Sequence, residues 1–117
     1  EDGTFIPHER LTFPAEPARS YAYCSDTRYT PRLAEMIQGV DLLYHEATFP
    51  HEMLTQAQKT MHSTSIEAAM MAKSAGAAKL LIGHYSARIK NESPLLEEAK
   101  SVFPNTILAQ EGVKIRI

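Results

Sequence analysis

Several residues with catalytic or metal-binding potential stand directly after apolar runs of the sequence. Asp26 follows the first such run, His45 and Glu46 follow the second, and His84 follows the third. Another histidine, His62, lies just ahead of a helix-like segment. If the apolar runs are parallel strands, their carboxyl ends meet at one edge of a sheet, where ligands gather. Carboxylates and imidazoles there predict either a metal site or an acid–base pair.

Each of these residues also has a purely structural interpretation. Asp26 could satisfy the amides of the loop that follows it. His84, after an apolar strand, fits a hydrogen-bonded structural histidine, and His62 fits an ordinary loop residue. His45 comes one position before Glu46 on an alternating strand, so the two side chains are expected to point in opposite directions. Spacing alone leaves both interpretations open.

Hydrophobic periodicity and turn residues divide the chain into alternating strands and helices. Such alternation is typical of an α/β layered fold with a largely parallel sheet, and no internal domain boundary interrupts it. The pattern predicts strands at 20–24, 40–44 and 79–83, two short strands between 106 and 117, and helices at 30–39, 51–59, 62–76 and 93–102.

Two of the predicted helices carry capping signals. In the first, Thr30 suits the N-cap and Pro31 the first helical position. In the third, Thr64 and Glu67 form the S/T-x-x-E pattern of a capping box, and Gly76 suits a left-handed stop. The inward stripe expected on the first helix consists of Leu33, Met36 and Ile37.

Composition sets broad limits on what the protein does. The 117 residues fit one domain, and the segment 1–19, with three of the seven prolines, is expected to be an irregular arm ahead of a domain at 20–117. No run is long and apolar enough to span a membrane. The single cysteine, Cys24, favours the cytoplasm. A net charge of −2 does not exclude nucleic acid, because a locally basic cleft suffices. The chain opens on Glu-Asp-Gly-Thr, which suggests the interior of a longer protein.

A specific family resemblance is carried by four segments taken in order. They are SYAYCSDTRY, LLYHEATF, MHSTSIEAAMMAKSAGAAKLLIGHYSARI and SPLLEEAKSVFPNTILAQEG. Together they resemble the C-terminal half of ribonuclease Z, the tRNA 3′-processing endonuclease family of the metallo-β-lactamase superfamily. The resemblance covers roughly residues 14 to 112 and implies an α/β fold, the second half of an αβ/βα sandwich.

The resemblance also implies roles for the matching residues. Asp26 would bridge two zinc ions, and His84 would be a terminal ligand of one of them. Glu46 would orient and stabilise His62, which would protonate the departing 3′ oxygen of a precursor tRNA. A histidine held by a carboxylate suits that role near neutral pH.

Other implications concern partners and missing parts. The His-x-His-x-Asp-His motif of the superfamily is absent from this sequence, so we expect the chain alone to cleave tRNA negligibly. Family members form homodimers, and this half is expected either to self-associate or to pack against its N-terminal half. Arg28, Arg88 and Lys90 are candidate RNA contacts, and Ile89 stands where the family has Tyr. Two alternatives stay open: another metallo-β-lactamase-fold phosphodiesterase or hydrolase, and a non-catalytic half-domain that self-associates.

Overall fold

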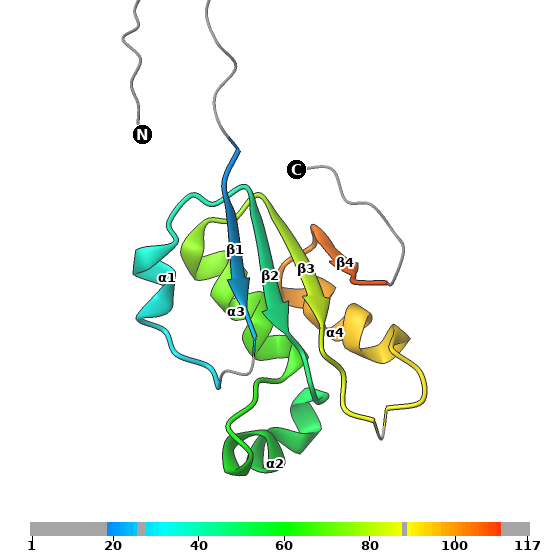
Figure 1. The fold of residues 1–117 in the computed structure, drawn as a ribbon. Coiled ribbons are helices and arrows are strands. Elements are labelled where there is room, and N and C mark those ends of the chain that lie inside the picture. Colours follow the sequence, from blue (N-terminus) through cyan, green and yellow to red (C-terminus); the bar gives the residue numbers. More distant parts are fainter. Residues whose placement is uncertain (1–18, 26–27, 88, 111–117) are drawn as a thin grey trace, which may run out of the picture.

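The computed structural model describes residues 19–25, 28–87 and 89–110. Within them, four strands form one sheet in the order β1-β2-β3-β4, and every neighbouring pair is parallel (Figure 1). This confirms the predicted α/β fold with a parallel sheet. The strands are β1 (Tyr21–Cys24), β2 (Leu42–Glu46), β3 (Lys79–Gly83) and β4 (Thr106–Leu108).

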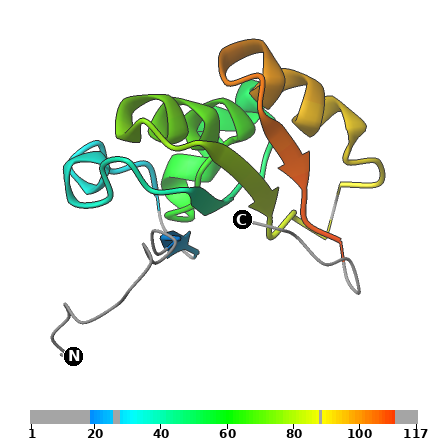
Figure 2. The same cartoon turned by 90° about the horizontal axis from the view of Figure 1, so that it is seen from above.

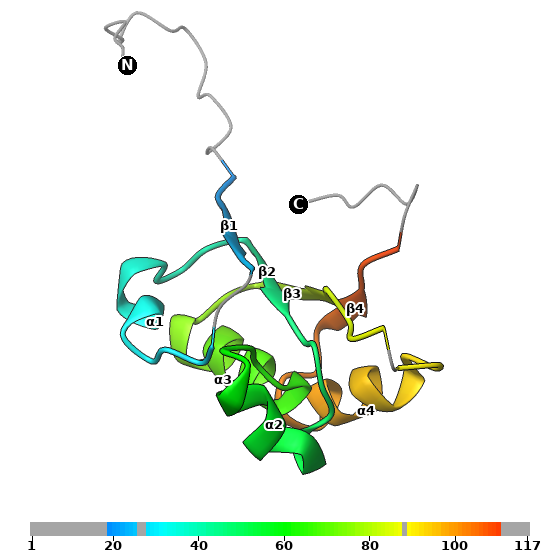
Figure 3. The same cartoon turned by 60° about the horizontal axis from the view of Figure 1, so that its bottom comes forward.

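The helices connect successive strands and cover one face of the sheet. Figures 2 and 3 show α1, α3 and α4 on the same side of the strands, and no described helix lies on the opposite side. The described part of the chain is therefore a two-layer structure. The helices are α1 (Leu33–Met36), α2 (Leu54–Lys59), α3 (Ser65–Ala75) and α4 (Ser93–Val102), and a short 3₁₀ helix, η2 (His51–Met53), precedes α2.

The hydrophobic core lies between the sheet and α3. Leu43, Leu80 and Ile82 project from the central strands toward the helices and are fully buried. Alanines fill most of the inner face of α3, so this helix approaches the sheet closely, and Met71 occupies the space that remains.

The face of the sheet opposite the helices carries aromatic side chains. Tyr21 and Tyr23 alternate with core-facing residues along β1, and they are 51% and 63% exposed. The ring of Tyr23 stacks on that of Tyr44 in β2, with 4.6 Å between the centroids. An exposed aromatic surface of this kind is typical of a sheet face that packs against something else.

The capping signals predicted the third helix correctly. The Thr64 hydroxyl accepts a hydrogen bond from the Glu67 amide at 3.2 Å, and the Glu67 carboxylate accepts one from the Thr64 amide at 3.0 Å. Gly76 ends the helix in the left-handed region, at φ +65°. The helices predicted at 51–59 and 93–102 are also present, the former as η2 followed by α2.

The first predicted helix is much shorter than expected. Hydrogen bonds from the Leu33 amide to the Thr30 carbonyl and from the Ala34 amide to the Pro31 carbonyl span three residues, so this part of the chain is a turn. The Thr30 hydroxyl does not cap a helix but donates to the Arg28 carbonyl at 3.0 Å. The prediction that Thr30 and Pro31 begin the helix was wrong, because local turn bonds replace the cap.

The predicted inward stripe of this helix was also partly wrong. Leu33 and Ile37 pack against the core, but Met36 is 79% exposed and Ala34 is buried in its place. With a single helical turn, the face toward α3 is narrow and admits a small residue.

The second strand is displaced from its predicted position. It runs to Glu46, two residues beyond the predicted end, so Glu46 belongs to the strand itself. The strand predicted to follow β4, and the arm expected over 1–19 except its last residue, lie outside the described residues.

Candidate active site at the carboxyl end of the sheet

Glu46 is the centre of a polar cluster where β2 and β3 end. It is fully buried and pairs in register with Gly83 on the neighbouring strand. Its carboxylate accepts hydrogen bonds from the Thr48 hydroxyl at 2.7 Å and from the Ser63 amide at 2.9 Å. A buried carboxylate is tolerated only with such partners, so the loops after β2 and α2 are built around it.

His62 is a further partner of this carboxylate. Its Nδ1 lies 2.9 Å from Glu46 Oε2 and 3.2 Å from Oε1, while the His62 side chain is 24% exposed. Since a carboxylate only accepts, Nδ1 carries a proton and Nε2 is directed away from Glu46. The pair therefore presents one imidazole nitrogen outward and holds the other on a fixed anion.

The backbone before His62 is held in an uncommon conformation. Met61 has φ +62°, in the left-handed region that costs a non-glycine residue about 1–2 kcal/mol. The His62 amide then donates to the Ala57 carbonyl at 2.8 Å, which ties the turn to the end of α2. Strain of this kind is often found where a functional side chain has to be aimed.

His84 follows β3 and has the same left-handed conformation, at φ +61°. The hydroxyl of Thr48 lies 2.9 Å from the His84 carbonyl oxygen and 3.2 Å from its Nδ1. The rings of His84 and His62 are 5.5 Å apart between centroids. Thr48 therefore joins the carboxylate of one strand end to the imidazole of the next.

Glu46, His62 and His84 together provide a donor set suited to a divalent metal. Each offers one ligand atom, and these atoms lie within 4.8 Å of one another. Imidazole nitrogen and carboxylate oxygen are the donors that zinc and related cations take in proteins. The chemistry of the cluster thus fits a metal, and it equally fits an acid–base pair next to one.

The structure brings together most, but not all, of the residues predicted from the sequence. Glu46, His62 and His84 converge at one sheet edge, as the parallel strands predicted. Asp26 and Arg88 lie outside the described residues, so the cluster is described without them.

His45 points away from this cluster, as the alternation of the strand predicted. It is fully buried on the helix side of the sheet, and its Nδ1 donates to the Glu46 carbonyl at 2.8 Å. Its Nε2 is buried and has no hydrogen-bond partner among the residues that the structure describes. Burial lowers the pKa of His45 below its ordinary value, although the bond to the Glu46 carbonyl partly opposes this. His45 is a neutral core residue.

Sequence reasoning missed two residues near the site. The first is Thr48, whose position two residues after Glu46 on an alternating backbone is a usable signal. The second is His51: its loop-like sequence context predicts a solvated surface position, and this prediction is wrong. His51 is half-buried, its Nδ1 lies 2.8 Å from the Thr64 hydroxyl, and its amide donates to Glu98 at 3.0 Å.

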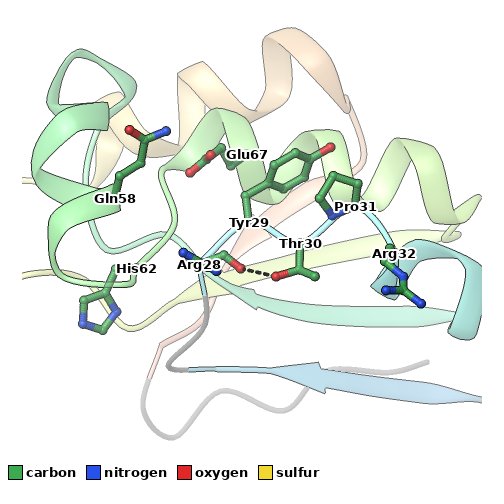
Figure 4. Close-up of a pocket in the computed structure, with 8 residues that line it drawn as sticks. All are labelled: Arg28, Tyr29, Thr30, Pro31, Arg32, Gln58, His62 and Glu67. Carbon is green, nitrogen blue, oxygen red and sulfur yellow. Dashed lines mark hydrogen bonds between the residues drawn. The ribbon is translucent and has the colours of Figure 1, made fainter.

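A hollow of about 560 Å³ opens beside His62 (Figure 4). It is formed where the turn before α1 faces the end of α2 and the start of α3. Arg28, predicted as an RNA contact, lines this hollow, and so does a second arginine, Arg32. The full lining is Arg28, Tyr29, Thr30, Pro31, Arg32, Gln58, His62 and Glu67.

Comparisons with known proteins agree with this geometry. The ribonuclease Z of Porphyromonas gingivalis is 57% identical over 114 residues, which are 97% of this chain. That of Bacteroides fragilis strain YCH46 is 52% identical over 116 residues, 99% of this chain. The chain is similar to one segment of ribonuclease Z. It spans 38% of the length of each of these two relatives, and no family model matches it.

Solved structures give the same result for the fold. The metallo-β-lactamase-fold protein YhfI of Bacillus subtilis superposes with a TM-score of 0.75 at 29% identity, over 82% of this chain and 39% of that one. The short form of human tRNase Z gives a TM-score of 0.54 at 28% identity, over 72% of this chain and 28% of that one. The resemblance and fold class inferred from the motifs are both confirmed.

Proposed function

We propose that this chain is the C-terminal part of a zinc-dependent endoribonuclease that removes 3′ trailers from tRNA precursors. One observation carries the proposal. A buried carboxylate, Glu46, fixes Nδ1 of His62 beside His84, in a chain similar throughout to ribonuclease Z. The reaction hydrolyses a phosphodiester and leaves a 3′-hydroxyl on the tRNA.

The proposed role of His62 is proton donation to the leaving oxygen. Water adds to the phosphorus, the bond from phosphorus to the 3′ oxygen breaks, and the 3′ oxygen takes the proton from Nε2 of protonated His62. Solvent then returns a proton to His62, and the water's own proton is released. Glu46 stabilises the imidazolium before the transfer and keeps the ring aimed, since both of its carboxylate oxygens lie within 3.2 Å of Nδ1.

The metal ligands proposed within this chain are Asp26 and His84. Two zinc ions, when bound, would supply an activated water and neutralise charge on the phosphoryl oxygens. Thr48, at 3.2 Å from His84 Nδ1, holds that nitrogen, so Nε2 of His84 would be the atom available to a metal. Two protein ligands are fewer than a catalytic zinc takes, so further ligands come from the upstream part of the enzyme.

The partners follow from the same assignment. Precursor tRNA is the proposed substrate, with Arg28 and Arg88 as candidate contacts to its phosphates. The exposed tyrosine face of the sheet is the proposed docking surface for the N-terminal half, and the complete enzyme is proposed to be a cytoplasmic homodimer. No described helix is long and apolar enough to cross a membrane.

A chimera tests the proposal. This chain replaces the matching segment of the Porphyromonas gingivalis ribonuclease Z, whose 57% identity makes the exchange structurally compatible. We expect the chimera to cut a 3′-extended precursor tRNA once, giving a 3′-hydroxyl product, and to lose this activity on removal of zinc with a chelator. The chain alone, as control, should show negligible cleavage. A folded, zinc-loaded chimera that leaves the precursor intact would contradict the proposal.

A second candidate is a metallo-β-lactamase-fold hydrolase that acts on small phosphodiesters. The higher TM-score of YhfI, 0.75 against 0.54 for human tRNase Z, means that the fold of this chain is not particular to enzymes named for tRNA processing. Turnover of a chromogenic phosphodiester and of precursor tRNA by the same chimera separates the two. Efficient turnover of the small substrate with none of the tRNA would favour this candidate.

A further inference from the structure

The hollow beside His62 has the charge and shape of a nucleotide site. Its volume of about 560 Å³ lies within the range of about 300–1,000 Å³ typical of small-ligand pockets. Arg28 and Arg32 are both exposed on its wall, while Tyr29 and Pro31 supply apolar surface between them. Guanidinium groups bind phosphate with paired hydrogen bonds, and apolar walls accommodate a base or a ribose.

The one acidic residue of the lining does not cancel this charge. The Glu67 carboxylate accepts the Thr64 amide at the start of α3 at 3.0 Å, so it is already engaged in the capping box. The titratable groups lining the hollow are therefore two arginines, His62, Tyr29 and this one bonded carboxylate. The balance favours an anion.

The order of the lining residues gives the hollow a direction. Figure 4 shows His62 and Gln58 at one end, Arg32 at the other, and Arg28 between them. The proton donor thus lies at one end of a row of cationic side chains.

We infer that this hollow binds the last nucleotide retained in the tRNA product, on the 5′ side of the scissile bond. The inference rests on the proposed function, in which His62 protonates the leaving 3′ oxygen. That oxygen belongs to the upstream nucleotide, so this nucleotide occupies the space that His62 borders. Its own 5′-phosphate then lies at Arg28, and the preceding phosphate lies toward Arg32.

The trailer is a poorer occupant of the same hollow. After cleavage it carries the phosphate, and none of its atoms requires a proton from His62. A trailer nucleotide would place the scissile phosphate, not the leaving oxygen, at the end of the row. The two alternatives differ in which linkage of the substrate must be charged, and this difference can be measured.

The test uses the chimera with precursor tRNAs that carry a single neutral methylphosphonate. We expect substitution of the linkage immediately 5′ of the last retained nucleotide to raise KM about tenfold, as expected for loss of one charge-assisted contact. Arg28→Ala should raise KM for the unmodified substrate by a similar factor, and should add little when that linkage is already neutral. Arg28→Lys should recover part of the loss, since a point charge replaces the paired contact.

Controls separate this inference from general attraction of RNA. Arg19→Ala removes an exposed arginine outside the hollow and should leave KM unchanged. Equal effects of Arg19→Ala and Arg28→Ala would overturn the inference, as would independent, additive effects of Arg28→Ala and the upstream methylphosphonate. A coupling of Arg28 to a trailer linkage instead would also overturn it. In each of these cases the unmodified precursor is still cut, whereas failure of the unsubstituted chimera to cut it would refute the proposed function itself.

Discussion

The Glu46 carboxylate holds the polar cluster together, and in the proposed function it also orients the proton donor. This carboxylate joins three segments, through Thr48 after β2, Ser63 before α3, and His62 between them. The contacts from Thr48 and Ser63 fix the position of the carboxylate. The contact to His62 then fixes the orientation of the imidazole ring. In the proposed mechanism, the negative charge of Glu46 stabilises the protonated imidazole of His62, which a neutral hydrogen-bond acceptor would do less well.

Replacing Glu46 by Gln in the chimera should therefore lower kcat for precursor tRNA by about 10²- to 10⁴-fold, the usual contribution of general acid catalysis. The amide still hydrogen-bonds but no longer stabilises the imidazolium. Single-turnover cleavage measures the effect. Glu97→Gln, which neutralises an exposed carboxylate on α4, is the matched control and should be neutral. Near-normal kcat for Glu46→Gln would contradict the assigned role.

His45 should make the stability of the chain depend on pH. Its folded pKa is lowered by burial from an ordinary 6.5, so below about pH 6.5 the unfolded chain binds a proton that the folded chain does not. This contribution to stability is present above about pH 6.5 and is lost as the pH falls below that value. Urea unfolding with a metal chelator present measures this slope. His45→Leu should flatten it, and identical slopes for the two proteins would refute the prediction.

Residue types and alternation predicted much of the site. Glu46, His62 and His84 were identified because parallel strands bring their ends together, and the inward direction of His45 followed from its neighbour. Thr48 and the buried position of His51 were not predicted, because both depend on how loops fold back onto other elements. Those contacts join residues that are 13 to 47 positions apart in the sequence, so a local sequence pattern does not predict them.

At the scale of elements, the close packing of β3 just before His84 depends on Gly83. A side chain added at Gly83 would place its Cβ 2.5 Å from the Tyr44 hydroxyl and 3.1 Å from Ala109. Only glycine therefore lets β3 lie this close to Tyr44, next to the strand end where His84 begins its left-handed turn.

Gly83→Ala should destabilise the chain by about 1–3 kcal/mol, the usual cost of overpacking a close contact. Urea unfolding provides the measurement. Tyr44→Phe removes the clashing hydroxyl, so Gly83→Ala should cost less in that background, and the double-mutant cycle reports the difference. Equal costs in the two backgrounds would show that Tyr44 is not the obstacle.

Elements with strong local signals were predicted best. The capping box and left-handed Gly76 defined α3 because both are determined within a few residues. The turn around Thr30 was not predicted, because the helical cap and the turn place similar demands on the same residues. Only the Thr30 contact to the Arg28 carbonyl decides between them.

At the scale of the whole molecule, the described helices lie on one face of the sheet (Figure 2). The stacked side chains of Tyr23 and Tyr44 lie on the other face. The layer order follows from the alternation of strands and helices in the sequence. The sequence does not predict what covers the second face, because the pattern of β1 is equally suited to solvent and to a partner.

The exposed tyrosines should cause the isolated chain to associate. We expect sedimentation velocity to show species larger than a monomer, and Tyr23→Lys to shift the distribution toward monomer by placing charge on this face. Met36→Lys, at an exposed position on α1, is the control and should change nothing. A clean monomer that unfolds cooperatively would contradict the docking role of the tyrosine face.

The proton transfer from His62 is the central claim and can be tested directly. In the chimera, His62→Ala should strongly slow cleavage of a normal precursor tRNA. When sulfur replaces the leaving 3′ oxygen, the His62→Ala variant should cleave almost as fast as the unsubstituted chimera, because a thiolate leaves without a proton. An equal loss of rate on both substrates would contradict general acid catalysis by His62.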